Sequence, residues 1–131
     1  MIEVKVYSRK TEQYAAASAH FKVYEFASKD GAEPVLISPK LLEVLEKIRA
    51  HFGAPVTISS GYRSPAHNAK VGGAAQSQHL YGAAADIQVK GVSPTQVADY
   101  AETLMPTWGG IGRYSNFIHV DVRDNKSRWK G

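Results

Sequence analysis

With 131 residues, 44% of them hydrophobic and 21% charged, the chain is long enough to bury a core. We expect one folded domain spanning residues 1–131 rather than a disordered chain, and the lack of cysteine excludes disulfides and thiolate metal sites. The net charge of +4 comes without a basic and aromatic stripe or a long apolar run, so we expect neither a nucleic-acid partner nor a membrane span.

The N-terminal part of the chain gives weak signals. Residues 2–7 alternate apolar and polar side chains, which predicts a half-exposed edge strand. Residues 11–27 contain an alanine run that favours a helix, although the surrounding apolar residues follow no clear period. The first residues lack the charged-then-apolar pattern of a signal peptide, so the sequence leaves the localisation open.

Two helices have clear start and stop signals. Ser38 and Ser93 are suitable N-caps, and each is followed by proline, which is favoured at the first helical position. The first helix is expected to end at Gly53 and the second before Pro106. In the first helix the apolar residues recur at helical spacing, at Leu41, Leu45, Ile48 and Phe52.

Short segments elsewhere predict strands. They are residues 55–59, 84–89, 109–114 and 117–122, of which the last two are expected to pair as a hairpin. A short helical turn is expected from Ser64 to Ala69, while the polar tail after residue 122 predicts no regular element. Helices that precede, separate and flank short strands indicate an α+β fold with a small, mostly antiparallel sheet.

Two histidines and one aspartate form the first candidate site. His79 and Asp86 lie seven residues apart among small residues, and His119 lies in the last predicted strand. Two imidazoles and one carboxylate are the smallest protein shell for a catalytic zinc ion, which keeps a fourth position for water. If the predicted strands are neighbours, the three side chains can converge on one ion. Zinc is the first choice, and other divalent metals suit the same donors.

The pattern Ser77-x-His79-x-x-Gly82-x-Ala84-x-Asp86 continues this site into a longer motif. With the upstream segment 60–64 and the downstream segment 117–121, it closely resembles the M15 family of zinc D-alanyl-D-alanine carboxypeptidases. That group includes phage endolysin peptidases and shares a fold with the hedgehog signalling domain. The resemblance covers residues 18–123. It implies a zinc-dependent carboxypeptidase or endopeptidase of peptidoglycan peptides, with Zn²⁺ held by His79, Asp86 and His119. We expect the protein to be a monomer.

Three further residues are candidates for contact with substrate. Arg63 matches the arginine that faces the substrate in this family, and a guanidinium suits a carboxylate or a developing oxyanion. The alternative for Arg63 is a surface ion pair. Ser77 could bind substrate or brace the loop of His79. Tyr62 could line the cleft or pack in the core.

The general base is missing from its usual place. The best-known members have a glutamate three residues before the last ligand or a histidine two before it, but these positions are Asn116 and Phe117 here. Asp121 is the nearest carboxylate and shares a strand face with His119. It is therefore a candidate catalytic residue together with Arg63, either as the base or, as we favour, as a partner of a ligand imidazole. His67 and His20 are weaker candidates.

Two functions remain open from the sequence. The first is a zinc hydrolase, and the alternative is a non-catalytic, zinc-stabilised module that binds cell-wall peptides. Either function requires the protein to reach peptidoglycan, by export or by phage-type release.

Overall fold

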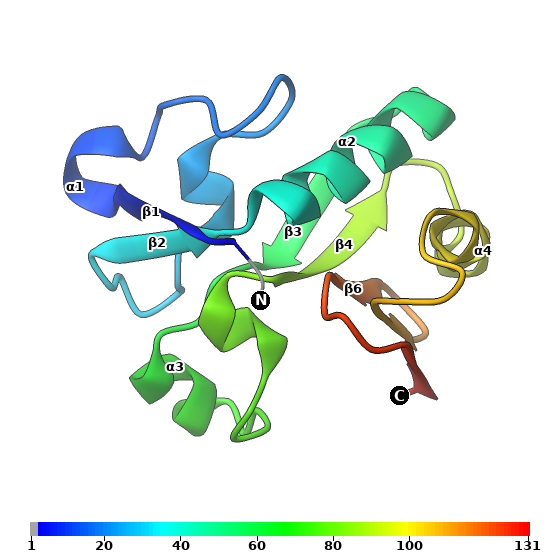
Figure 1. Cartoon of the computed structure of the whole chain (residues 1–131). Helices are drawn as coiled ribbons and strands as arrows, with labels where there is room; N and C mark the ends of the chain where they lie inside the picture. Colours follow the sequence, from blue (N-terminus) through cyan, green and yellow to red (C-terminus); the bar gives the residue numbers. More distant parts are fainter. Residues whose placement is uncertain (1–2) are drawn as a thin grey trace.

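A five-stranded sheet forms the framework of the computed structural model, which describes residues 3–131 (Figure 1). Its strands are β3 (Val56–Ser60), β4 (Ala84–Val89), β5 (Gly110–Arg113), β6 (Ile118–Asp121) and β7 (Ser127–Lys130). They lie side by side in the order β3-β4-β6-β5-β7. All neighbours are antiparallel except β5 and β7, which run parallel. The predicted α+β architecture with a mostly antiparallel sheet is confirmed.

Two helices cover one face of this sheet. In Figure 1, α2 (Pro39–Phe52) lies across β3 and β4, while α4 (Pro94–Leu104) packs against β4, β5 and β6. Both helices begin as predicted, because the hydroxyls of Ser38 and Ser93 accept hydrogen bonds from the backbone N–H groups three residues further on. The core beneath them includes Leu41, Leu45 and Ile48 of α2 and Ile58, Ile87, Ile118 and Val120 of the sheet. None of the helices in residues 3–131 has the length and apolar character needed to cross a bilayer.

The other face of the sheet carries the polar residues. Because side chains alternate along a strand, Ile87 and Ile118 point into the core, while the neighbouring Asp86 and His119 point to the opposite face. This face is bordered by the segment that joins β3 to β4, which contains α3 (Pro65–Lys70) and the 3₁₀ helix η2 (Gln78–Tyr81). In Figure 1, α3 lies beyond the end of β3, away from α2.

A β-bulge shifts the register of β3 against β4 just before this segment. Ile58 pairs with Ile87 and Ser60 with Asp86, so two residues of β3 advance for one residue of β4. A bulge bends its strand and redirects the side chains beside it, and bulges often lie next to active sites. Here the bulge places Ser60 directly opposite Asp86.

The predicted N-terminal strand is present, but it buries the opposite face. β1 (Lys5–Ser8) pairs with β2 (Pro34–Ile37) in a separate two-stranded sheet. The side chain of Val6 is 63% exposed, whereas Tyr7 is only 7% exposed. Residue 2, part of the predicted strand, lies outside the described residues. Since the side-chain period of a strand is two, a one-residue error in the phase exchanges the two faces.

The alanine run does not form a helix. After α1 (Arg9–Glu12), the chain makes turns held by backbone hydrogen bonds across the segment, and the next helix is the 3₁₀ helix η1 (Val23–Phe26). Ala16 pairs with Lys22 in an isolated bridge. Phe21, Val23 and Phe26 are buried by this path. Tertiary packing of these three side chains therefore outweighs the local helix propensity of alanine.

The polar tail contains a strand that the sequence pattern did not predict. β7 pairs in parallel with β5, with Trp129 opposite Gly112. The guanidinium of Arg128 donates to the carbonyl oxygens of Met105 and Gly109 and pairs with Glu102, which ties β7 to the end of α4. The partners of Arg128 in these bonds are distant in sequence, so no local pattern predicts the strand.

Candidate metal centre

His79, Asp86 and His119 meet on the polar face of the sheet. Asp86 of β4 lies opposite His119 of β6 in the antiparallel register, and η2 brings His79 to the same point. One donor atom from each residue lies within 4.8 Å of the others, and all three residues are buried. In the part of the chain that the structure describes, this is the only such cluster of three metal-ligating side chains. The structure therefore brings the predicted triad together.

Each histidine has one ring nitrogen fixed and the other turned toward Asp86. The carbonyl of Gly61 accepts a hydrogen bond from Nδ1 of His79 at 2.7 Å, and Oδ2 of Asp121 accepts one from Nε2 of His119 at 2.7 Å. The remaining nitrogens, Nε2 of His79 and Nδ1 of His119, lie 3.4 Å and 3.1 Å from Oδ1 of Asp86. A partner on the outer nitrogen sets the tautomer and ring orientation that a metal ligand needs.

The donor set fits a divalent metal ion. Two ligands about 2.0–2.1 Å from a tetrahedral ion are separated by about 3.3 Å, close to the distances from Asp86 to the two imidazole nitrogens. Two nitrogens and one carboxylate oxygen are donors that zinc accepts, and three protein ligands leave a fourth position for water or substrate. The arrangement has the composition and orientation of a hydrolytic metal site.

Electrostatics keep the carboxylate of this cluster ionised. Burial alone would raise the pKa of Asp86, but hydrogen bonds with His119 and then His79 outweigh it and hold this pKa well below the usual value. Burial would likewise lower the pKa of His119, but its hydrogen bonds with Asp121 and Asp86 raise it. The Asp86 carboxyl is therefore charged over the whole physiological range of pH.

The triad lies in a cleft of about 460 Å³. The lining comes from two parts of the chain. One part precedes β4 and supplies Arg63, Gly73, Ala74, Gln76, Ser77 and Gln78. The other part lies around β5, β6 and β7 and supplies Tyr114, Phe117, Arg123 and Trp129. The rings of Tyr114 and Phe117 stack with centroids 4.4 Å apart, and the indole N–H of Trp129 donates to the Tyr114 hydroxyl at 2.9 Å. One wall of the cleft is thus aromatic and the other mostly polar.

Arg63 and Ser77, both predicted to contact substrate, lie beside the triad of His79, Asp86 and His119. Nε of Arg63 donates to the Ser60 hydroxyl at 3.2 Å, and Nη2 lies 3.7 Å from Oδ2 of Asp86. The backbone N–H of His79 donates to the Ser77 hydroxyl at 3.2 Å. Both side chains line the cleft. Arg63 is therefore held beside the metal triad, and Ser77 caps the helical turn that presents His79.

Tyr62 and Asp121 are placed differently from the other candidates. Tyr62 is 6% exposed and is not part of the cleft lining, so the structure does not bring it to the site. Asp121 is fully buried beneath His119, where its carboxylate also accepts hydrogen bonds from Arg123 and from the backbone N–H of Gly110. It reaches the metal triad only through the outer edge of the His119 ring.

Two glycines make room for this arrangement, and the sequence analysis missed their role. A Cβ atom on Gly110 would collide with the Asp121 carboxylate, and one on Gly112 would lie 2.5 Å from the indole nitrogen of Trp129. The two glycines alternate in β5 and so share one face with His119, opposite Gly112. Glycines spaced by two in a predicted strand were the available signal that large groups approach the strand closely.

The remaining histidines take no part in the cluster. His20 bonds to Glu46 at 2.6 Å, and His51 stacks on Tyr100 with ring centroids 3.7 Å apart. His67 lies in α3 and does not line the cleft. The weaker candidates for a base, His20 and His67, are thus not brought to the metal triad.

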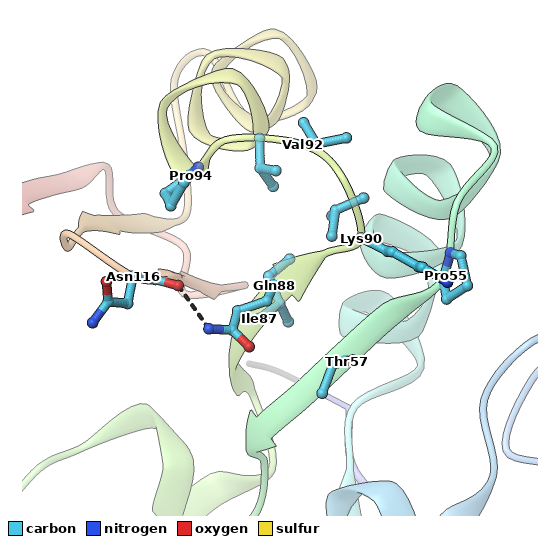
Figure 2. Close-up of a pocket in the computed structure, with 10 residues that line it drawn as sticks. Pro55, Thr57, Ile87, Gln88, Lys90, Val92, Pro94 and Asn116 are labelled. Carbon is cyan, nitrogen blue, oxygen red and sulfur yellow. Dashed lines mark hydrogen bonds between the residues drawn. The ribbon is translucent and has the colours of Figure 1, made fainter.

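A second hollow of about 440 Å³ lies further along β4 (Figure 2). Figure 2 shows Gln88 reaching toward the hairpin turn, where its side chain donates to the Asn116 carbonyl at 2.8 Å. Pro55, Val92 and Pro94 border the hollow, and Lys90 is its only titratable lining residue. With no carboxylate or imidazole in the lining, this hollow lacks the groups that hydrolysis needs.

Comparison with known proteins agrees with the geometry of the cluster. A model of the family described as Peptidase M15 matches residues 16–121, which include all three members of the triad. The chain is 36% identical over 105 residues to a probable peptidoglycan L,D-endopeptidase MepK of Haemophilus influenzae, with 72% of this chain and 55% of the relative covered. It is 33% identical over 95 residues to the peptidoglycan L,D-endopeptidase MepK of Escherichia coli, with 66% and 51% covered.

The chain spans about half the length of these curated relatives. The family match, however, runs through η2, β4 and β6, the three elements that supply the cluster. M15 peptidases are in general zinc-dependent, and the His79–Asp86–His119 cluster is a site that could hold a metal ion. The chain belongs to the M15 peptidase family.

Proposed function

We propose that this protein is a zinc-dependent hydrolase of peptidoglycan peptides. The observation that carries the proposal is the convergence of His79, Asp86 and His119 in an open cleft, with both outer imidazole nitrogens already bonded. The relatives named as peptidoglycan L,D-endopeptidases support the choice of substrate and favour an endopeptidase over a carboxypeptidase. When bound, zinc would supply an acidified water and polarise the scissile carbonyl.

We assign to Arg63 the stabilisation of the negative charge that develops on the scissile carbonyl oxygen. The Arg63 side chain is 18% exposed, lines the cleft and donates hydrogen bonds to Ser60 and Asn68. A guanidinium that is fixed before the reaction stabilises an oxyanion without reorganising. We also propose that Ser77 presents His79 by capping its helical turn, a task that leaves one side of its hydroxyl for the substrate.

Asp121 orients His119 in this proposal and is not the general base. Its Oδ2 bonds the imidazole at Nε2, whereas Nδ1 is the nitrogen that faces Asp86. Five donors from Gly110, Arg123 and His119 surround the carboxylate, which is 0% exposed. A carboxylate in this position holds a ligand imidazole and raises its basicity.

The test is hydrolysis of purified wall fragments by the zinc-loaded protein. Cross-linked and monomeric muropeptides would be incubated with the wild type and with His79→Ala, and products identified by mass spectrometry. We expect cleavage by the wild type only, and the masses of the products identify the bond. Chelation should abolish the activity and added zinc should restore it. Tight binding of these peptides with no cleavage would reject the hydrolase in favour of a zinc-stabilised binding module.

A further inference from the structure

Arg123 lies in the cleft but has no assigned role in the proposed reaction. It follows β6 by two residues, and its side chain is 31% exposed. Nε donates to Oδ1 of Asp121 at 2.8 Å, and Nη2 donates to Oδ2 at 2.7 Å. The guanidinium also lies over the Trp129 ring, 5.5 Å from its centroid. A paired carboxylate on one edge and an indole face together hold the group in a fixed orientation.

This arrangement leaves part of the guanidinium available to a ligand. A guanidinium has five N–H donors, and Asp121 engages one on Nε and one on Nη2. Within residues 3–131, no other acceptor bonds to the Arg123 side chain. Both donors of Nη1 and the second donor of Nη2 are therefore available to a ligand. Because Arg123 is part of the cleft lining, a bound molecule can reach these donors.

The charge of the cleft favours an anionic ligand. Arg63 and Arg123 both line it, and Asp86 is the only acidic residue in the lining. Asp86 and the buried Asp121 balance the two arginines, so a bound divalent ion would leave the cleft with a net positive charge. The two arginines also stand apart in the sheet order, since Arg63 follows β3 while Arg123 follows β6 and contacts β7. They bracket the metal triad from two sides.

We propose that Arg123 binds a carboxylate of the peptide substrate and selects peptides that carry this group free over peptides in which it is amidated. This inference rests on the proposed function, because the cleft must accept a wall peptide. Asp121 holds the edge formed by Nε and Nη2, and the remaining donors of Nη1 and Nη2 match the two oxygens of a carboxylate. An amide offers a single oxygen acceptor and no negative charge, so it forms a weaker pair.

The test compares three synthetic wall-type peptides of identical sequence. The first has a free side-chain carboxylate and a free C-terminus, the second has an amide at the side chain, and the third has an amide at the C-terminus. Zinc-loaded wild type, Arg123→Gln and Arg123→Lys would each be measured. The readout is kcat/KM where the peptide is cleaved and Kd from calorimetry where it is not, so that selection is measurable without catalysis.

We expect the wild type to prefer the free acid by about tenfold to a hundredfold over one of the two amides, and that amide identifies which carboxylate is bound. Arg123→Gln should act on all three peptides with nearly equal efficiency, and Arg123→Lys should keep part of the preference. Lys47→Gln is the matched control, since it removes one positive charge from α2 on the opposite face of the sheet. It should keep the full preference.

Other outcomes overturn the inference. A wild type without preference would do so, and so would a preference that survives in Arg123→Gln. An equal loss on all three peptides in Arg123→Gln would show a purely structural role through Asp121. A preference in Kd that depends on Arg123, with no cleavage of any peptide, would uphold the inference and reject the proposed hydrolysis.

Discussion

Asp121 is the residue whose contacts decide how the site is organised. It joins His119, Arg123 and the backbone of Gly110 while remaining completely buried. Burial would raise the pKa of this carboxyl, but its hydrogen bonds with His119 and Arg123 keep the pKa well below its usual value. A permanently charged carboxylate behind an imidazole favours the tautomer in which Nδ1 is free to bind a metal.

Replacing this carboxylate should weaken metal binding. We expect Asp121→Asn to lower zinc affinity by about 10- to 100-fold, because the amide no longer fixes the His119 tautomer. Competition with a chromophoric chelator measures the change. Asp99→Asn serves as the control, since Asp99 is exposed and pairs with Arg113 outside the cleft. Unchanged zinc affinity in Asp121→Asn would contradict the orienting role.

A substitution at Gly110 tests the close contact between the β5 backbone and the Asp121 carboxylate. A methyl group at this position would occupy the space of the Asp121 carboxylate, which is held by three neighbours and cannot move freely. We expect Gly110→Ala to reduce the free energy of unfolding by about 1–3 kcal/mol, measured by urea denaturation, and to weaken zinc binding as well. Wild-type stability and zinc affinity in this variant would show that the close approach is not needed.

At the scale of elements, the N-terminus of α3 is held by a network that reaches across the chain. The Ser64 hydroxyl accepts a hydrogen bond from the backbone N–H of His67 and donates to Asp30 at 2.5 Å. The hydrogen bond from Ser64, and then that from Ser28, lowers the pKa of Asp30 to about 2. Because α3 also carries Asn68, which bonds to Arg63, this network supports the loop beside the cleft.

The Asp30 contact should produce a defined pH dependence. A carboxyl whose pKa is lower in the folded than in the unfolded state stabilises the fold above its unfolded pKa, and this contribution disappears as the pH falls through the folded value. We expect the stability difference between wild type and Asp30→Asn to be constant near neutral pH and to shrink between pH 3.8 and about 2. Paired thermal melts across this range measure it, and a difference independent of pH would disprove the contact's role.

The predictability of each element follows from where its stabilising contacts lie. The starts of α2 and α4 were predicted because Ser38 and Ser93 act on backbone groups three residues away. The non-helical conformation of the alanine run could not be predicted, since it depends on the burial of Phe21 among distant segments. The strand β7 could not be predicted either, since the hydrogen bonds of Arg128 reach distant residues. The motif predicted that His79, Asp86 and His119 converge, whereas the cleft wall at Trp129 required the parallel pairing of β7 with β5.

At the scale of the whole molecule, the candidate metal site joins separate parts of the chain. Its members come from η2, β4 and β6, and the hydrophobic core is a single cluster that includes residues from Tyr7 to Val122 of the sequence. An ion bound by all three elements would stabilise the folded state relative to the unfolded chain. The N-terminal sheet of β1 and β2 contributes to this core through Tyr7, Val35 and Ile37.

Zinc should therefore raise the melting temperature. At a free zinc concentration one hundred times the Kd, the expected stabilisation is about 2.7 kcal/mol. Scanning calorimetry of the metal-stripped protein, with and without zinc, measures the shift. His79→Ala should abolish most of it, whereas His51→Ala, outside the cluster, should keep it. If zinc does not change the melting temperature of the wild type, the triad is not a metal site.

The contact between Trp129 and His119 gives the protein an internal optical reporter. Their ring centroids are 5.0 Å apart, so the emission of this indole should respond to the charge on the imidazole and to the filling of the cleft. The chain has one other tryptophan, Trp108, which lies under the amine of Lys40 away from the cleft. Fluorescence of a Trp108→Phe variant would then follow metal loading and peptide docking in real time, without a label.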